Sequence, residues 1–152
     1  RQAIFVGLNA PTSPTWKWEP PRNAMRVINW IVPAPDGAQT AELVVTYFRE
    51  APGNTIDANI RRWSSQFRDG DLPAQPEITE IEQASLPVTL VELNGEYLGM
   101  SGGFHKADYT MLVAMVTSPS GSVFIKLLGP NETVAQTRGD FMAMLEGIEP
   151  VR

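Results

Sequence analysis

The run "NIRRWSSQF", residues 59–67, places polar side chains at a spacing that suits binding. At about 100° per residue in a helix, Asn59, Arg62 and Gln66 form one row beside an apolar band that contains Trp63. A guanidinium group between two amides can hold an anion or a peptide through several hydrogen bonds. The row can also be structural, with its side chains bonded to a neighbouring loop or strand so that they fix how the helix docks.

Two further places in the sequence offer candidate binding groups. Trp16 and Trp18 flank Lys17, and in an extended chain both rings face the same way. Such a pair can stack on a sugar, cover a sheet edge or close the core. Lys126 interrupts an apolar segment, where it can bind a substrate or lie on an outer face in an ion pair.

Catalytic and metal chemistry have weak support in the sequence. "GMSGG" at 99–103 matches the G-x-S-x-G motif of serine hydrolases, which needs a helix directly after the serine. The polar "FHKADY" that follows is unsuited to that helix, and the only histidine, His105, lies four residues after Ser101. With one histidine and no cysteine, a zinc site is not expected either. We therefore expect a protein without catalytic residues, bound metal or cofactor.

Composition narrows the possible partners. The chain has 152 residues, 43% of them hydrophobic, and a net charge of −5. This length suits a single domain over residues 1–152, with a partly irregular N-terminal segment at 1–22. The negative charge argues against binding to nucleic acid or to anionic lipid. The sequence starts at Arg1, so any signal peptide or lipid anchor is expected upstream, and membrane attachment only through such an anchor.

The pattern of apolar residues predicts the elements that position these side chains. Ile56, Ile60, Trp63 and Phe67 follow helical spacing, and Asn54 with Asp57 resembles a capping box. A second helix begins near residue 129. Asn94-Gly95 marks either a tight turn or a break within a strand. Strands are expected at 3–8, 24–32, 41–48, 87–98, 109–117 and 122–129. The predicted fold is α+β, an antiparallel sheet of about six strands covered by helices.

Two sequence motifs carry a resemblance to known proteins. These are "N-x-x-R-W-x-x-Q" (Asn59, Arg62, Trp63, Gln66) and "K-L-x-G-P" (Lys126, Leu127, Gly129, Pro130). With the strands, they resemble a family of bacterial envelope proteins of uncharacterised function over most of residues 16–148. Members typically follow a signal peptide or lipoprotein signal. The order of elements also resembles the Mog1/PsbP-like αβα sandwich. The resemblance implies a secreted or periplasmic domain, with a lipid anchor as a further expectation, and transfers no catalytic residue.

These observations lead to two functional hypotheses. The first is a non-enzymatic interaction or assembly domain of the cell envelope that binds another envelope protein. The alternative is a module for a small ligand, peptide or carbohydrate, using the Trp16/Trp18 pair or the Asn59–Arg62–Gln66 row. The absence of a catalytic constellation is compatible with both hypotheses.

Overall fold

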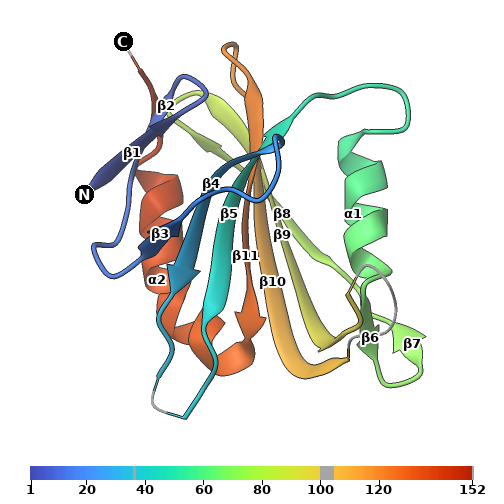
Figure 1. Cartoon of the computed structure of the whole chain (residues 1–152). Helices are drawn as coiled ribbons and strands as arrows, with labels where there is room; N and C mark the ends of the chain where they lie inside the picture. The colour runs from blue at the N-terminus through green and yellow to red at the C-terminus, as the bar shows by residue number, and fades with distance from the viewer. Residues whose placement is uncertain (36, 100–104, 152) are drawn as a thin grey trace.

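Antiparallel pairing joins most of the strands into one large sheet (Figure 1). The computed structural model describes residues 1–35, 37–99 and 105–151, so the Ser101 motif lies outside the described residues. Within that part of the chain the sheet has nine strands, in the order β3-β4-β5-β11-β10-β9-β6-β7, with β8 also paired to β9. Their bounds are β3 Lys17–Glu19, β4 Arg26–Val32, β5 Ala41–Phe48, β6 Phe67–Asp69, β7 Leu72–Pro73, β8 Glu77–Gln83, β9 Leu86–Tyr97, β10 Lys106–Val116 and β11 Ser122–Pro130.

A small second sheet is built from the two ends of the chain. It consists of β1 (Gln2–Phe5), β2 (Leu8–Pro11) and β12 (Glu149–Pro150). The single strand expected at 3–8 is in fact a hairpin, because Val6 and Gly7 both adopt positive φ and turn the chain between β1 and β2. Residues 1–22 therefore contain three short strands joined by turns.

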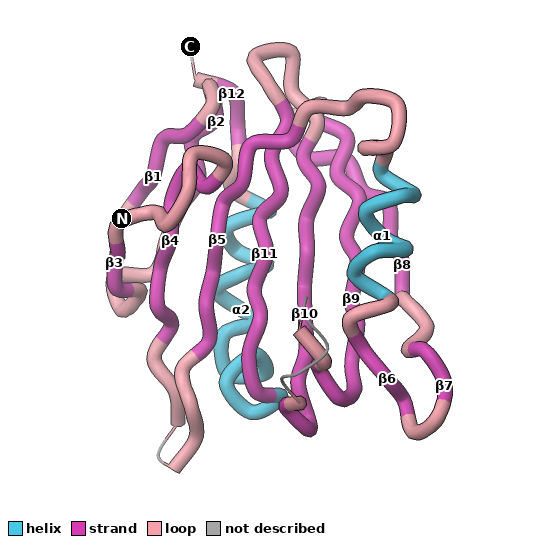
Figure 2. The backbone as a smooth tube through the Cα atoms, turned by 45° about the vertical axis from the view of Figure 1, so that its right-hand side comes forward, coloured by secondary structure: helices cyan, strands magenta, loops and turns pink. Residues whose placement is uncertain are grey.

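The large sheet has a helix on each face (Figure 2). α1 (Ile56–Ser64) packs on one face and α2 (Asn131–Glu146) on the other, each over its own hydrophobic core. Successive side chains of a strand point to opposite faces, so β10 supplies both cores. Its residues Met111, Val113 and Met115 face α1, while Leu112, Ala114 and Val116 face α2. Being apolar on both faces suits β10 to the middle of the sheet, as the sequence predicts.

The prediction of about six strands is wrong, because the sheet has nine. The largest omission is β8, whose sequence "EITEIEQ" contains three glutamates and is mostly exposed. It pairs only with β9 among the described strands, and such an exposed edge lacks the apolar pattern that reveals a strand. β3, β6 and β7 have only two or three residues each. The sheet nevertheless confirms an antiparallel α+β fold, including the expected β10–β11 hairpin.

The start of α1 differs from the expected capping box. Thr55 is the N-cap, and its hydroxyl accepts a hydrogen bond from the Ala58 N–H at 3.1 Å. Asn54 instead donates its side-chain amide to the Arg49 carbonyl at 2.6 Å, because it lies one residue too early to cap the helix. The helix ends at Ser64, so Phe67 belongs to β6. Neither helix of the described chain has the length and hydrophobicity needed to cross a bilayer.

Candidate functional site

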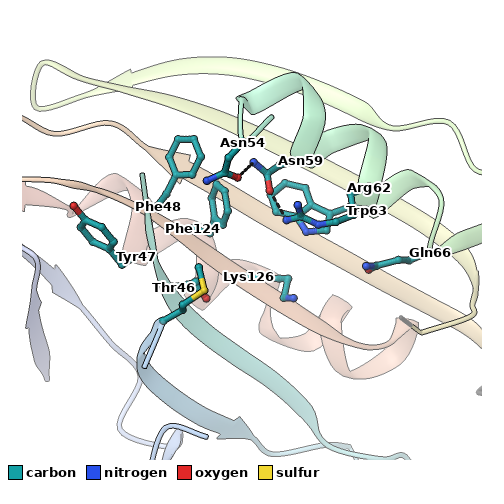
Figure 3. A pocket seen from close by; sticks show the side chains of 11 residues that line it. Thr46, Tyr47, Phe48, Asn54, Asn59, Arg62, Trp63, Gln66, Phe124 and Lys126 are labelled. Carbon is teal, nitrogen blue, oxygen red and sulfur yellow. Dashed lines mark hydrogen bonds between the residues drawn. The ribbon is translucent and has the colours of Figure 1, made fainter. Parts of the chain in front are cut away.

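A pocket of about 500 Å³ lies between α1 and the neighbouring strands β5 and β11 (Figure 3). Phe48, Trp63 and Phe124 form its apolar side, with Tyr47 and Met25 at the exposed rim. The size is within the range of sites for small organic ligands, which combine apolar walls with a few polar groups.

The aromatic side of the pocket is firmly packed. Phe48 and Phe124 stack with their ring centroids 4.6 Å apart. Trp63 meets Phe124 edge-on at 5.1 Å and 79°. Trp63 is 3% exposed, which confirms the prediction from helical spacing that it is a core residue. These contacts hold the apolar wall in place without any ligand.

The polar row predicted from the helical spacing lines the same pocket beside Trp63, and its members differ in burial. Asn59 is fully buried and donates to Asn54 Oδ1 at 3.0 Å and to the Thr55 carbonyl at 2.7 Å. Its own Oδ1 accepts a hydrogen bond from Arg62 Nη2. Arg62 is exposed, and Gln66 is half-buried. Asn59 is therefore a structural group that orients Arg62, while the guanidinium keeps other N–H donors free for solvent or a ligand.

Lys126 reaches the pocket from the sheet. It lies on β11 between Val44 of β5 and Val113 of β10, and it is half-buried. Within the described part of the chain, its ammonium has no hydrogen-bond or ion-pair partner. Burial lowers the pKa of Lys126, as do the positive charges of Arg26 and Arg62, whereas Glu42 opposes this shift. An unpaired, partly desolvated cation is costly to the fold, which makes it a candidate for binding.

Glu42, the carboxylate that opposes the pKa shift of Lys126, already forms an ion pair with Arg26. Arg26 Nη1 lies 3.3 Å from Glu42 Oε1 and also donates to Asn29 Oδ1 at 2.7 Å. Both partners of this ion pair are mostly shielded from solvent. Lys126 thus interacts electrostatically with two other cations, Arg26 and Arg62, and with one carboxylate, Glu42.

Four of the six candidate residues meet in this pocket, namely Asn59, Arg62, Gln66 and Lys126. The other two do not form the expected stacking pair. Trp16 is 5% exposed and packs on Trp30 at 5.5 Å, whereas Trp18 is 58% exposed. The alternation of an extended chain does not apply, because Trp16 lies between the turn at residues 14–15 and the start of β3 at Lys17. Thr46, Phe48 and Phe124 were not identified from the sequence, although their alternation along the strands could have placed them on the face of Lys126.

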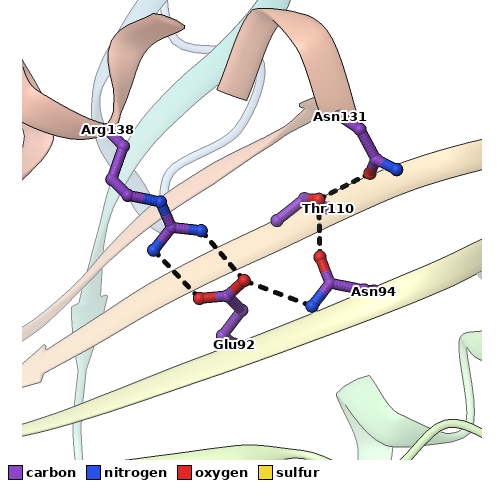
Figure 4. A network of polar contacts seen from close by, with 5 residues as sticks. All are labelled: Glu92, Asn94, Thr110, Asn131 and Arg138. Carbon is purple, nitrogen blue, oxygen red and sulfur yellow. Dashed lines mark hydrogen bonds and ion pairs between the residues drawn. The ribbon is translucent and has the colours of Figure 1, made fainter. Parts of the chain in front are cut away.

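A second polar network joins α2 to the other face of the sheet (Figure 4). Arg138 donates to both oxygens of Glu92, at 3.0 and 2.9 Å, and Asn94 donates to Glu92 at 3.2 Å. The Thr110 hydroxyl donates to Asn94 Oδ1 at 2.7 Å and lies 2.6 Å from the Asn131 amide, whose nitrogen is placed to donate to it. Each side chain has a partner, so this network is structural. No group of three or more potential metal ligands exists among the residues described.

The Glu92–Arg138 pair predicts a pH-dependent stability. Hydrogen bonding to Arg138 is the largest influence on Glu92 and lowers its pKa, against the opposing effect of burial. A carboxylate with a lowered pKa stabilises the fold above its ordinary pKa, and the contribution is lost as the pH falls through the folded-state value. Glu92→Gln is therefore expected to cost about 0.5–1 kcal/mol at pH 7, with the difference from the unsubstituted protein shrinking below about pH 4.

Urea unfolding at pH 7 and at acidic pH measures this effect. Glu80→Gln on exposed β8 is a suitable control, expected to change stability by less than about 0.5 kcal/mol at both pH values. A Glu92→Gln penalty that persists unchanged in acid would contradict the ion-pair explanation.

Comparison with known proteins addresses the fold. No protein-family model matches the sequence, and no curated protein matches it either. Among solved structures, cyanobacterial PsbP (CyanoP) from Synechocystis sp. PCC 6803 aligns with a TM-score of 0.63, covering 99% of this chain and 91% of that one. The fold is PsbP-like. A Pseudomonas aeruginosa protein of unknown function, PA94, aligns with a TM-score of 0.60 over 86% of this chain and 94% of its own.

The sequence identities to these two proteins are 9% and 7%. At these levels the PsbP-like similarity concerns the fold alone and assigns no activity to this chain. It confirms the fold-level expectation from the order of helices and strands. The pocket beside α1 is therefore interpreted from its own residues.

Proposed function

We propose that this PsbP-like domain is a non-enzymatic binding module whose ligand occupies the pocket between α1, β5 and β11. The observation that supports the proposal is the Lys126 ammonium, half-buried at the pocket and without a partner among the described residues. Folding alone gives no reason to keep a desolvated cation there, because an apolar residue on this strand would fit the core at lower cost. A bound ligand would supply the missing partner.

The lining also favours binding over catalysis. The described residues around the pocket include no Asp, Glu or His. Proton transfer at a reacting group normally relies on one of these side chains, with a pKa near the working pH. An Arg held in place by Asn59, a lysine and an aromatic wall together form a recognition surface.

A fragment screen by NMR tests where small molecules bind. We expect apolar fragments to shift the backbone amides of Thr46, Phe124 and Lys126, which surround the pocket. Thr46→Trp should abolish these shifts, because Thr46 lies on β5 opposite Phe124 and a larger side chain would fill the space. Thr79→Trp on exposed β8 is the matched control. Fragments that bind elsewhere, or that are unaffected by Thr46→Trp in a folded protein, would refute this location of the site.

We also propose that the domain works in the cell envelope, secreted or periplasmic. This rests on the resemblance carried by the motifs around Arg62 and Lys126, both of which contribute to the pocket. In this proposal an envelope protein can present the ligand, so the two functional hypotheses share one site. Fractionation of cells that make the native protein tests the location, and a purely cytoplasmic pool would contradict it.

A further inference from the structure

We infer that the ligand of this pocket is an amphipathic anion, a carboxylate attached to an apolar body. The inference rests on the proposed function and specifies its ligand. Lys126 and Arg62 would hold the carboxylate, with the Gln66 amide as a further donor, while the body lies against Trp63 and Phe124. The following observations support each half of this ligand.

The charge distribution selects an anion. The chain as a whole has a net charge of −5, yet Lys126 lies within the electrostatic influence of two further cations, Arg26 and Arg62, and of only one carboxylate. That carboxylate, Glu42, already binds Arg26 at 3.3 Å, so it is not available as a full partner for Lys126. A cationic ligand would meet two uncompensated charges of its own sign. An anion would meet opposite charge in a partly desolvated place, where such attraction is stronger than in water.

The donor set suits a carboxylate better than a phosphate dianion. Proteins often hold phosphate with the free N–H groups at a helix N-terminus. Here the Ala58 N–H in the first turn of α1 is bonded to Thr55, and Arg62 and Gln66 lie toward the other end of the helix. The Asn59 amide is used internally, since it donates to Asn54 and Thr55. An ammonium, a guanidinium and one amide provide enough donors for the two oxygens of a carboxylate.

The apolar side of the pocket indicates that the rest of the ligand is apolar. Phe48, Trp63 and Phe124 contact one another and present a fixed aromatic wall. Ligand binding therefore needs little reorganisation of this wall, which favours affinity for an aromatic or aliphatic group. A small hydrophilic anion such as acetate would leave that wall exposed to water.

Three matched probes separate charge from shape: 4-phenylbutyrate, 4-phenylbutanamide and 4-phenylbutylamine. They share one apolar body and differ in the head group, which is anionic, neutral or cationic at pH 7. NMR titration of the whole domain gives a dissociation constant for each. We expect the carboxylate to bind at least about tenfold more tightly than the amide, as for a hydrogen bond to a charged partner. The amine should bind more weakly than the amide.

Three lysine variants show which cation is responsible. Lys126→Met should reduce the preference for carboxylate over amide by about tenfold while keeping amide binding, and Lys126→Arg should retain most of the preference. Lys17→Met is the matched control, because Lys17 lies on edge strand β3 with β4 and β5 between it and β11. If Lys126→Met does not fold, Arg62→Gln on the exposed helix surface replaces it and should also weaken the preference.

The outcomes distinguish this inference from the proposed function. If carboxylate and amide bind equally well and Thr46→Trp blocks both, the inference that the ligand is an anion would be overturned. The proposal that the pocket is a binding site would stand. Failure of all three probes and of the fragment screen would overturn both. A peptide ending in phenylalanine, compared as free acid and as amide, separates two sources of the carboxylate. Tighter binding of its free acid than of phenylbutyrate identifies a protein C-terminus, and the reverse order identifies a small molecule; both support the inference.

Discussion

Trp63→Ala is expected to destabilise the folded protein by about 3–5 kcal/mol, the range for removing a large buried aromatic side chain. Trp63 is 3% exposed and belongs to the core between α1 and the sheet. Its edge-on contact with Phe124 would be lost, and the helix would retain Ile60 as its main buried apolar anchor. Urea unfolding followed by circular dichroism, analysed at constant slope, measures the loss.

Arg61→Ala serves as the neighbouring control for this experiment. Arg61 is exposed on the opposite side of α1, so its replacement should change stability by no more than about 0.5 kcal/mol. A Trp63→Ala penalty below about 1 kcal/mol would show that α1 is not anchored on the sheet through this side chain. Because α1 also forms one wall of the pocket, the shape of the pocket given above would then be wrong as well.

Gly95→Ala is expected to cost about 3 kcal/mol or more. Gly95 has φ of +142°, a conformation that L-residues rarely adopt. An added Cβ would also overlap the backbone carbonyl oxygen of Arg68, where β6 pairs with the end of β9. Neither the strained backbone nor a clash with main-chain atoms can be relieved by a side-chain rotation. Thermal and urea unfolding both report the effect.

Gly139→Ala provides a control of opposite sign. Gly139 is an exposed position within α2, and a Cβ there would meet no atom within 4 Å outside the helix's own backbone. Alanine should stabilise the protein by about 0.5–1 kcal/mol through its higher helix propensity. Destabilisation by both glycine substitutions would indicate that the loss at Gly95 is not specific to its backbone conformation.

Gly95 also shows what the sequence could and could not predict. The pair Asn94-Gly95 is compatible in the sequence with a hairpin turn or with a break inside a strand, but the structure has neither, because both residues pair with β10 within the continuous strand β9. The close approach of the Arg68 carbonyl, which requires a glycine at 95, comes from β6 and has no local signal in the sequence. By contrast, the strand predicted at 41–48 is confirmed, because β-branched and aromatic residues run without interruption from Val44 to Phe48. Local patterns were sufficient for the long buried strands of the large sheet, and insufficient for exposed β8 and for the short strands.

The candidate site also combines residues that a local pattern predicts with contacts that depend on the whole fold. Helical spacing alone predicts that Asn59, Arg62 and Gln66 line one row; Asn59 and Arg62 lie on α1, and Gln66, two residues after its end at Ser64, still lines the same pocket. Their proximity to Lys126 depends on the order of strands, which brings β11 to the side of the pocket that faces α1, from far along the chain. Nothing local encodes such a long-range contact. The prediction that Trp16 and Trp18 face the same way is wrong for a local reason. The extended strand β3 begins at Lys17, one residue after Trp16.

The acidic edge strand β8 bears on how copies of the protein behave toward each other. An open strand edge invites a second chain to add to the sheet, which is a common route to fibrils and precipitates. Glu77, Glu80 and Glu82 are all exposed along this edge. Two copies approaching edge to edge would bring these carboxylates together, and their repulsion would oppose such pairing. Because salt screens exposed charges, this protection weakens as ionic strength rises.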